Sequence, residues 1–252
     1  MAAGAQAMKL VLCGNGSVGK SSIIRRFVAD GFDRQYKQTV GLDFFEKAMR
    51  LKGDEMTTLQ VWDIGGQSIA SAMLDKYMGG AHVVFLCYDI TDTRSFADVD
   101  RWLAKARAAA AKHRSADAPK QHVFLVANKA DMIASRAVSE REHDEFVATN
   151  GLDGGFFVSA RNGDRVTKSF YAAAAQAAGV EMSAHDLAFH DTVVGYSAPT
   201  AHSGAGGTAP SAQEDAKLAK IREEDAEAER RMMAAMEAEA SGESKGACCA
   251  VM

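Results

Sequence analysis

A glycine-rich octapeptide, GNGSVGKS at residues 14–21, carries the residue types that bind phosphate. It fits the spacing G-x-x-x-x-G-K-[ST], follows an apolar run at 8–13 and precedes a stretch at 21–29 that favours a helix. Glycines let successive backbone N–H groups turn toward one anion, and the helix adds its N-terminal partial positive charge. The candidate phosphate-binding residues are Gly14, Asn15, Gly16, Ser17, Val18, Gly19, Lys20, Ser21 and Ser22. Lys20 is expected to reach the β- and γ-phosphates, and the Ser21 hydroxyl to ligate Mg²⁺.

A second motif, N-K-x-D, indicates which base the nucleotide carries. It follows the apolar run at 122–127, and the dipeptide Ser-Ala follows another short apolar run at 156–158. An aspartate carboxylate accepts two N–H bonds from guanine, whereas adenine offers no such pair of donors. The Ser-Ala dipeptide is expected to place a backbone N–H on the guanine oxygen. The candidate guanine-binding residues are Asn128, Lys129, Asp131, Ser159 and Ala160.

Two further segments carry residues suited to sensing a third phosphate. Asp63 follows the apolar run at 57–62, where a second anchor of the Mg²⁺ shell is expected. Gly66 is expected to offer its N–H to the γ-phosphate, and Gln67 to orient an attacking water. Thr39 can ligate Mg²⁺ only when a γ-phosphate holds its loop closed.

The candidate residues thus fall into three functional groups. The catalytic candidates are Gln67, Lys20 and Thr39. The metal ligands are expected to be Ser21, Thr39 and Asp63. Phe32, which is expected to stack on the edge of guanine, and Tyr36 complete the candidate nucleotide site.

The order of apolar and helical stretches predicts an α/β fold. Strands are expected at about 8–13, 43–51, 57–62, 82–88, 122–127 and 155–158, and helices at about 20–29, 69–78, 94–113, 139–149 and 164–178. A Gly-Asp pair at 53–54 suggests a hairpin, so the second and third strands should be antiparallel in a six-stranded, mostly parallel sheet flanked by helices. The candidate residues then lie at the carboxyl ends of the strands, where open α/β sheets bind ligands.

Length and composition suit one globular domain with an appendage. The chain has 252 residues, of which 47% are hydrophobic and 25% charged, and it holds no apolar run of 18 residues. The N-terminal residues lack the features of a signal peptide. Cys13 and Cys87 fall in expected core strands and are interpreted as small buried apolar residues, which is typical of a reducing, cytosolic compartment.

The composition changes beyond residue 180. We expect a flexible N-terminus at 1–7, a nucleotide-binding domain at 8–180, a flexible linker at 181–210 and a charged helical tail at 211–252. The tail holds ten acidic and six basic residues, a net charge of −4 that equals that of the whole chain. The domain is therefore neutral, and nucleic acid is not an expected partner. Whether the tail is an autoinhibitor, a spacer or an extra binding site stays open.

The last four residues, Cys249 to Met252, satisfy the C-a-a-X pattern for prenylation, and a terminal methionine favours farnesyl. One prenyl chain gives only marginal membrane binding. Cys248 is a candidate for a second lipid, either palmitoyl or prenyl. We expect a peripheral protein on the cytosolic face of a membrane, with a soluble prenyl-binding carrier if Cys249 alone is modified.

The first 180 or so residues resemble Ras-superfamily small GTPases, and specifically Rabs. The matching stretches are VGLDF (40–44), LQVWDIGGQ (59–67), KYMGGA (76–81) and LCYDIT (86–91). Phe44, Trp62 and Tyr77 match the Rab aromatic triad that effectors read. Within Rabs, WDIGGQ and MLDKY resemble the divergent subgroup numbered twenty-eight, which is farnesylated and linked to cilia and endosomal sorting. The resemblance implies a monomeric GTPase domain that takes GTP, GDP and Mg²⁺ and acts with an exchange factor, a GTPase-activating protein and effectors.

Several residues depart from the pattern of the resemblance. Most Rabs read D-T-A-G-Q-E where this chain reads D-I-G-G-Q-S at 63–68. Gly65 in place of alanine is expected to loosen the second switch, and Ser68 replaces a glutamate that exchange factors use. Arg161 replaces the lysine of the S-A-K element that contacts the nucleotide. Gln67 is retained, so hydrolysis is expected to be slow alone, about 10⁻⁴ s⁻¹, and roughly 10⁵-fold faster with an activating partner.

The sequence therefore favours a GTP-dependent switch that recruits effectors to membranes in vesicle, endosomal or ciliary traffic. Three alternatives stay open: a Ras- or Rho-type signalling GTPase, a GTP-binding scaffold that does not hydrolyse, and a P-loop kinase or ATPase. The N-K-x-D motif argues against the last of these.

Overall fold

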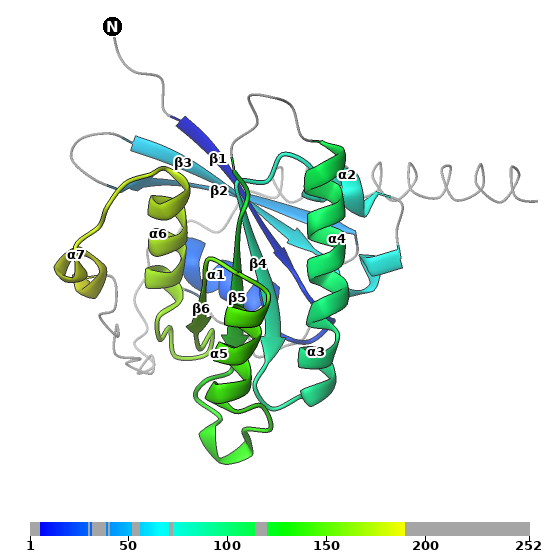
Figure 1. Cartoon of the computed structure of the whole chain (residues 1–252). Coiled ribbons are helices and arrows are strands. Elements are labelled where there is room, and N and C mark those ends of the chain that lie inside the picture. The colour runs from blue at the N-terminus through cyan, green and yellow to red at the C-terminus, as the bar shows by residue number, and fades with distance from the viewer. Residues whose placement is uncertain are drawn as a thin grey trace, which may run out of the picture. The chain divides into compact units, whose positions relative to one another are not determined.

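The computed structural model describes residues 6–29, 31, 39, 41–51, 56–70, 73–113 and 120–189. Within these residues six strands form one sheet in the order β2-β3-β1-β4-β5-β6 (Figure 1). The strands are β1 (Gln6–Cys13), β2 (Leu42–Arg50), β3 (Met56–Ile64), β4 (Val83–Asp89), β5 (His122–Asn128) and β6 (Gly154–Phe157). Strands β2 and β3 pair antiparallel and the other pairs are parallel, so the predicted fold class and the predicted hairpin pairing are confirmed.

The middle of the sheet is buried on both faces. All seven residues of β4 are buried, and β5 is buried from its second residue onward. Near-continuous apolar strands are what a parallel sheet needs when helices cover both of its faces. Strand β2, at the edge, mostly keeps its side chains exposed or half-buried. The edge strand can therefore present side chains to a partner, whereas β4 and β5 serve to hold the site.

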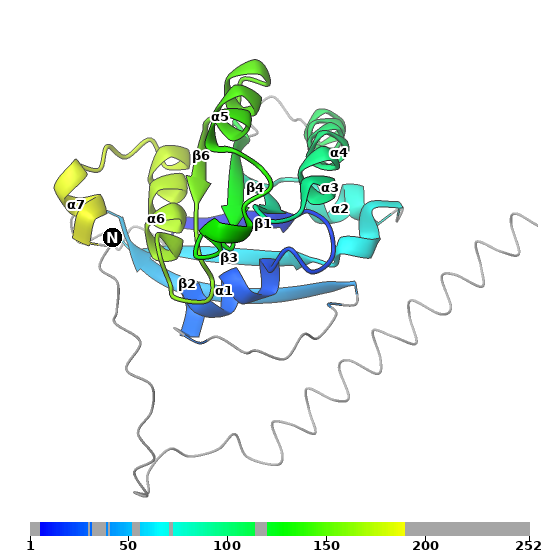
Figure 2. The same cartoon turned by 90° about the horizontal axis from the view of Figure 1, so that it is seen from below.

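Helices pack on both faces of this sheet (Figure 2). They are α1 (Lys20–Ala29), α2 (Leu74–Met78), α3 (Thr93–Ala97), α4 (Val99–Lys112), α5 (Glu140–Thr149) and α6 (Val166–Ala177). A further helix, α7 (Ala184–Phe189), lies beside α6 (Figure 1). On one face α1 meets α6, where the rings of Phe27 and Phe170 stack with centroids 3.9 Å apart. The other face is covered by α2, α4 and α5, with Trp102 and Leu74 among its buried residues. Two apolar clusters thus pack on the two faces of the sheet and hold in place the strands whose carboxyl ends carry the candidate residues.

The helix boundaries differ from the sequence prediction in three places. The helix predicted at 94–113 is two helices, because Asp98 ends α3 and precedes α4. The helix predicted at 69–78 is a 3-10 turn, η1 (Gly66–Ala70), followed by the short α2. Helix α7 lies within the segment predicted as a linker and was not predicted. Another 3-10 turn, η2 (Ile133–Ser135), precedes α5. Helix α5 begins as predicted, because Ser139 and Glu142 form a reciprocal capping box.

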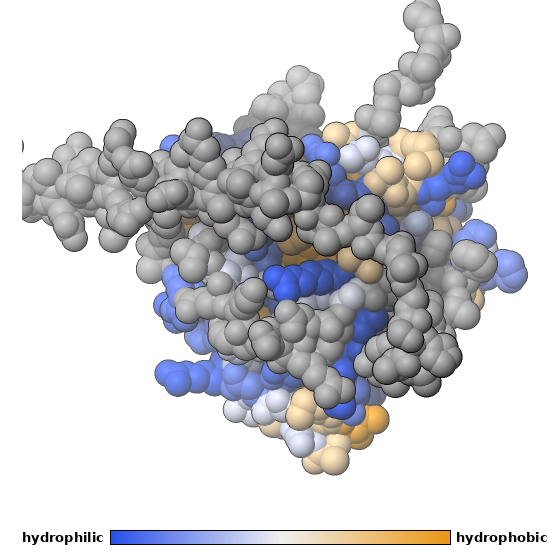
Figure 3. Space-filling model, turned by 180° about the vertical axis from the view of Figure 1, so that it is seen from behind, coloured by the Kyte–Doolittle hydropathy of each residue, from blue (hydrophilic) through white to orange (hydrophobic). Residues whose placement is uncertain are grey.

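Few large apolar side chains are exposed on the described part of the molecule. The exposed ones are Phe44, Met56, Met132 and Ile133. On the face seen in Figure 3, hydrophobic residues form separate groups among hydrophilic ones, with one group at the lower edge. None of the helices described is long and apolar enough to cross a membrane.

A buried histidine lies between the sheet and α5. His143 is 1% exposed, its Nδ1 is 3.0 Å from the hydroxyl of Tyr88, and its ring centroid is 4.3 Å from that of Phe157. Its Nε2 has no hydrogen-bond partner among the described residues. Burial lowers the pKa of His143 to about 4; Arg136 adds to the fall, and the acidic residues Asp144 and Glu140 oppose it.

This histidine should make the domain sensitive to acid. The pKa of His143 is lower in the folded state than its ordinary value of 6.5, so its contribution is complete above about pH 6.5 and is lost as pH falls toward 4. We expect the free energy of unfolding to fall by about 3 kcal/mol across that window from this residue alone. Chemical denaturation of wild type and His143→Leu at pH 7.5 and 5.0 measures the part lost above pH 5, about 2 kcal/mol. A pH dependence as steep in the variant as in wild type would contradict the prediction.

Candidate functional site

The loop between β1 and α1 is packed so closely that two of its positions exclude a side chain. A Cβ atom on Gly14 would lie 2.1 Å from the carbonyl oxygen of Cys87 in β4, and one on Gly19 would lie 2.3 Å from Nδ2 of Asn128. Both glycines also have positive φ angles, 140° and 94°. The loop can therefore wrap an anion with its backbone only because these residues lack a Cβ atom.

Lys20 begins α1 beneath this loop. Its side chain is buried, and its Nζ donates hydrogen bonds of 2.8 Å to the carbonyl oxygens of Gly14 and Asn15. Burial lowers the pKa of Lys20, while the negative charge of Asp63 acts in the opposite direction. The ammonium group is thus held against the loop that would carry the phosphates.

Asn15 contributes its backbone to the loop but turns its side chain away from it. Its Nδ2 donates to Oδ2 of Asp98 at 2.7 Å, and its Oδ1 accepts from the indole nitrogen of Trp102 at 3.0 Å. These contacts tie the loop to the start of α4. The carboxylate of Asp98, which receives Asn15, lies at the junction of α3 and α4, where the helix predicted at 94–113 is interrupted.

Three oxygen-bearing side chains meet beside the loop, each from a different segment. Oγ of Ser21 in α1 lies 2.5 Å from Oδ2 of Asp63 at the end of β3 and 2.7 Å from Oγ1 of Thr39. Thr39 Oγ1 is itself 3.3 Å from Asp63 Oδ2. The three residues predicted to ligate a metal are therefore brought together.

The chemistry of this cluster fits Mg²⁺, a hard cation that prefers oxygen ligands. Oδ1 of Asp63 is buried and has no hydrogen-bond partner among the described residues. Burial raises the pKa of the Asp63 carboxyl, and the hydrogen bond from Ser21 and the charge of Lys20 oppose the rise. A cation here would favour the ionised carboxylate and use its free oxygen.

The segment after Asp63 lies against the phosphate-binding loop. A Cβ atom on Gly66 would lie only 2.1 Å from the backbone nitrogen of Gly16. Gly66 therefore lies against the phosphate-binding loop, and its predicted hydrogen bond to a γ-phosphate stays a prediction. Gln67, the next residue, is exposed at the start of η1.

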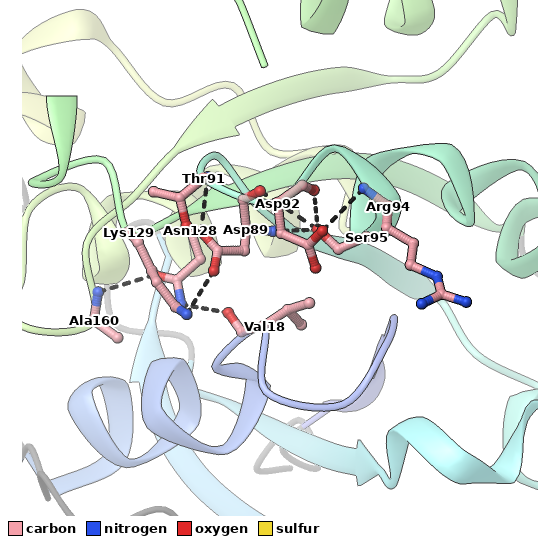
Figure 4. Close-up of polar contacts among 9 residues, drawn as sticks. All are labelled: Val18, Asp89, Thr91, Asp92, Arg94, Ser95, Asn128, Lys129 and Ala160. Carbon is pink, nitrogen blue, oxygen red and sulfur yellow. Dashed lines mark hydrogen bonds and ion pairs between the residues drawn. The ribbon is translucent and has the colours of Figure 1, made fainter. Parts of the chain in front are cut away.

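The candidate base-binding residues also lie near one another. Figure 4 draws Asn128, Lys129 and Ala160, with the side chain of Asn128 between Val18 and Ala160. Asn128 is buried; its Nδ2 donates to the carbonyl oxygen of Val18 at 2.8 Å, and its Oδ1 accepts from the backbone N–H of Ala160 at 3.1 Å. One side chain therefore joins the phosphate-binding loop, the end of β5 and the loop after β6. Lys129, with a positive φ of 64°, pairs with Asp89 at the end of β4 at 2.5 Å.

Asp131, the residue expected to read guanine, lies next to the loop after β6. Its Oδ1 accepts a 2.6 Å hydrogen bond from Oγ of Ser159, and its Oδ2 is 3.6 Å from the guanidinium of Arg161. The carboxylate is thus held in one orientation by Ser159. Arg161, which replaces a lysine of the family pattern, adds a cation beside it.

Sequence reasoning missed two residues that support the site. Arg26 of α1 donates to the carbonyl oxygens of Ala160 at 3.0 Å and Arg161 at 2.7 Å, and so holds the loop after β6 from below. No pattern in the sequence signals this contact. Asp89, the partner of Lys129, could have been found, because it is an acidic residue at the end of a buried strand on the same edge of the sheet.

Of the remaining predicted residues, some are described by the structure and others lie outside the described part of the chain. Phe44 is 48% exposed, and its ring meets that of Trp62 edge-on with centroids 5.6 Å apart. Tyr77 and Trp62 are half-buried and pack on the same apolar cluster. Lys9 Nζ lies 3.9 Å from the centre of the Trp62 ring. Ser17 and Ser22 occupy the loop and the first turn of α1. Four predicted residues lie outside the described part of the chain: Phe32, Tyr36, Cys248 and Cys249.

The hydrogen bond between Asn15 and Asp98 can be tested by replacing the amide of Asn15 with a carboxylate. Asn15→Asp would place a second carboxylate within hydrogen-bond distance of Asp98, and we expect it to lower the free energy of unfolding by about 2 kcal/mol. The double variant Asn15→Asp/Asp98→Asn restores one donor and one acceptor and should recover most of the loss. Denaturant titration of wild type, Asn15→Asp, Asp98→Asn and the double variant measures both effects. Equal stability of the single variant and wild type would show that the tie contributes nothing.

The comparisons with known proteins agree with this geometry. Residues 9–178 match the Ras family. The chain is 41% identical to Ras-related protein Rab-28 of Caenorhabditis elegans over 176 residues, which cover 70% of this chain and 69% of that protein. It is 37% identical to Ras-related protein SEC4 of Candida albicans over 65% of this chain and 74% of that protein. It is also 33% identical to the Ypt/Rab-type GTPase YPT7 of Saccharomyces cerevisiae, over 65% of this chain and 77% of that protein. The chain therefore belongs to the Ras family, as a small GTPase of the Rab type.

Proposed function

We propose that this GTPase is a switch whose GTP-bound form recruits effectors to a membrane in vesicle, endosomal or ciliary traffic. The observation that carries the proposal is the meeting of Ser21, Thr39 and Asp63, which come from three segments of the chain. A site that closes only when these segments converge can report whether the third phosphate is present.

The phosphates would lie on the loop at residues 14–21, where backbone N–H groups and Lys20 offer donors. Gly66 would donate its N–H to the γ-phosphate. Gln67 would orient the attacking water from its exposed position beside the loop. After hydrolysis the γ-phosphate leaves, so Gly66 would lose that acceptor and Thr39 would no longer be held where it can ligate Mg²⁺.

Ser21, Thr39 and Asp63 are the residues that would hold Mg²⁺. Bound there, the cation would neutralise charge on the β- and γ-phosphates. Asp131 would accept the two N–H groups of guanine, and the backbone N–H groups at the loop after β6 would face the guanine oxygen. Because Ser159 and Asn128 already hold these groups in place, little ordering would be needed when the base binds.

The effector surface would include Phe44, Trp62 and Tyr77. An exposed aromatic residue next to a half-buried one, on the edge strand and its neighbour, is a suitable anchor for a partner. Because Trp62 directly precedes Asp63 in the chain, a change at the metal site would reach the effector surface. Membrane attachment through Cys249, with or without Cys248, together with a prenyl-binding carrier, an exchange factor and an activating protein, completes the proposal.

Hydrolysis should depend on Gln67. We expect Gln67→Leu to lower the rate of GTP hydrolysis about tenfold or more, because the attacking water loses its orientation. GDP affinity should change little, because the side chain of Gln67 is exposed. Phosphate release under single-turnover conditions measures the rate, with Gln60→Leu on β3 as the matched control. Undiminished hydrolysis by Gln67→Leu would contradict the assigned role.

Guanine selection should depend on the carboxylate of Asp131. In Asp131→Asn one acceptor becomes a donor, so we expect GDP affinity to fall by about 100-fold or more while xanthosine diphosphate, which carries a carbonyl in place of the amine, binds better. Competition between the two nucleotides measures the preference. Asp144→Asn, on α5, is the control. If Asp131→Asn keeps the wild-type preference for GDP, another group reads the base.

The switch itself is tested by paired affinity capture. The baits are Gln67→Leu, intended as GTP-locked, and Ser21→Asn, intended as GDP-like or nucleotide-poor. Partners retained only on Gln67→Leu would support the proposal and identify the pathway. Identical partners on both baits would instead favour a scaffold whose binding does not depend on the nucleotide.

A further inference from the structure

Gly65 lies at the closest contact between the two segments that respond to the third phosphate. It is buried just after β3, and its N–H donates a 2.9 Å hydrogen bond to the carbonyl oxygen of Gly41. A Cβ atom on Gly65 would lie 2.6 Å from the carbonyl oxygen of Thr39 and 3.2 Å from that of Gly41. The first of these distances is shorter than any ordinary contact of a Cβ atom with backbone.

This packing gives glycine a role besides the expected loosening of the second switch, which stays an expectation. Gly65 does not have a positive φ angle, so its conformation is open to other residues and the requirement is one of space. Most Rabs carry alanine at the matching position. In this chain the backbone at Thr39 comes so close that a methyl group has no room.

The contact between Gly65 and Thr39 affects the position of the side-chain oxygens of Ser21, Thr39 and Asp63 relative to one another. The carbonyl of Thr39 faces Gly65, while the hydroxyl of the same residue is 2.7 Å from Ser21 and 3.3 Å from Asp63. Moving the carbonyl away from residue 65 would move the hydroxyl away from its partners. Asp63 precedes Gly65 by only two residues, so the same turn of chain sets both sides of the cluster.

We propose that Gly65 is a positioning residue that lets Thr39 lie against the end of β3, and that it thereby sets the preference of the site for GTP over GDP. The inference rests on the proposed switch, because only the third phosphate requires Thr39. The guanine side of the site, held by Asn128, Ser159 and Arg26, makes no contact with Gly65 among the described residues.

The test replaces Gly65 by alanine in the full chain and compares nucleotides. Gly154→Ala is the matched control, because its Cβ atom would lie 3.4 Å from Phe124, an ordinary contact. With Mg²⁺ present, we expect Gly65→Ala to bind a non-hydrolysable GTP analogue about 10- to 100-fold more weakly, which is the effect of losing a hydrogen bond to a charged group. GDP affinity should stay within about twofold. The ³¹P NMR signal of the γ-phosphate of the bound analogue should shift in Gly65→Ala and not in Gly154→Ala.

A double-mutant cycle separates positioning of Thr39 from a general effect on the fold. If Gly65 acts through Thr39, then Gly65→Ala should weaken analogue binding in wild type and add little to Thr39→Ala. Additive losses, equal losses for GDP and the analogue, or failure of Gly65→Ala to fold with GDP bound would each overturn the inference. If Thr39→Ala leaves analogue binding unchanged, the proposed switch fails as well; if only Gly65→Ala is without effect, the switch stands and the inference fails.

Discussion

The amide of Asn128 is the contact on which the site depends. It accepts from Ala160 and donates to Val18, so the loop after β1, the end of β5 and the loop after β6 share one buried group. An amide fits because it can donate and accept at once, and a buried amide left unpaired would be unfavourable. The same side chain lies so near Gly19 that no Cβ atom fits there. The phosphate half and the base half of the site are therefore placed by one residue.

The two halves are supported in different ways. On the base side, Arg26, Ser159 and Asp89 add hydrogen bonds and an ion pair between elements that belong to the core. On the phosphate side, Thr39 contacts Ser21 of α1 and the backbone at Gly65. A site built in this way can keep its base while one part of its phosphate side opens. A switch must keep its nucleotide bound while the surface near the third phosphate changes. The different support of the two halves of the site allows this.

Much of this could be predicted from the sequence, because the motif residues follow buried strands and parallel strands bring their carboxyl ends to one edge. Ser21, Asp63 and Asn128 were found in that way. What could not be predicted depends on contacts between segments. The side chain of Asn15 turns to α4, the predicted helix is interrupted at Asp98, and glycine at position 65 is required by its neighbours and not by its own backbone angles. Phe32 and Tyr36 lie outside the described residues, so their predicted contacts with the nucleotide stay predictions.

In the proposed switch, the third phosphate draws the segment at Thr39 and the segment at 65–68 onto the site together. Amide hydrogen exchange measured by mass spectrometry on the GDP form and on the form bound to a non-hydrolysable GTP analogue tests it most directly. The account predicts that both segments gain protection with the analogue, while β5 and the loop after β6 exchange equally in the two forms. Equal protection of the Thr39 segment in both forms, or gain in one segment without the other, would contradict it.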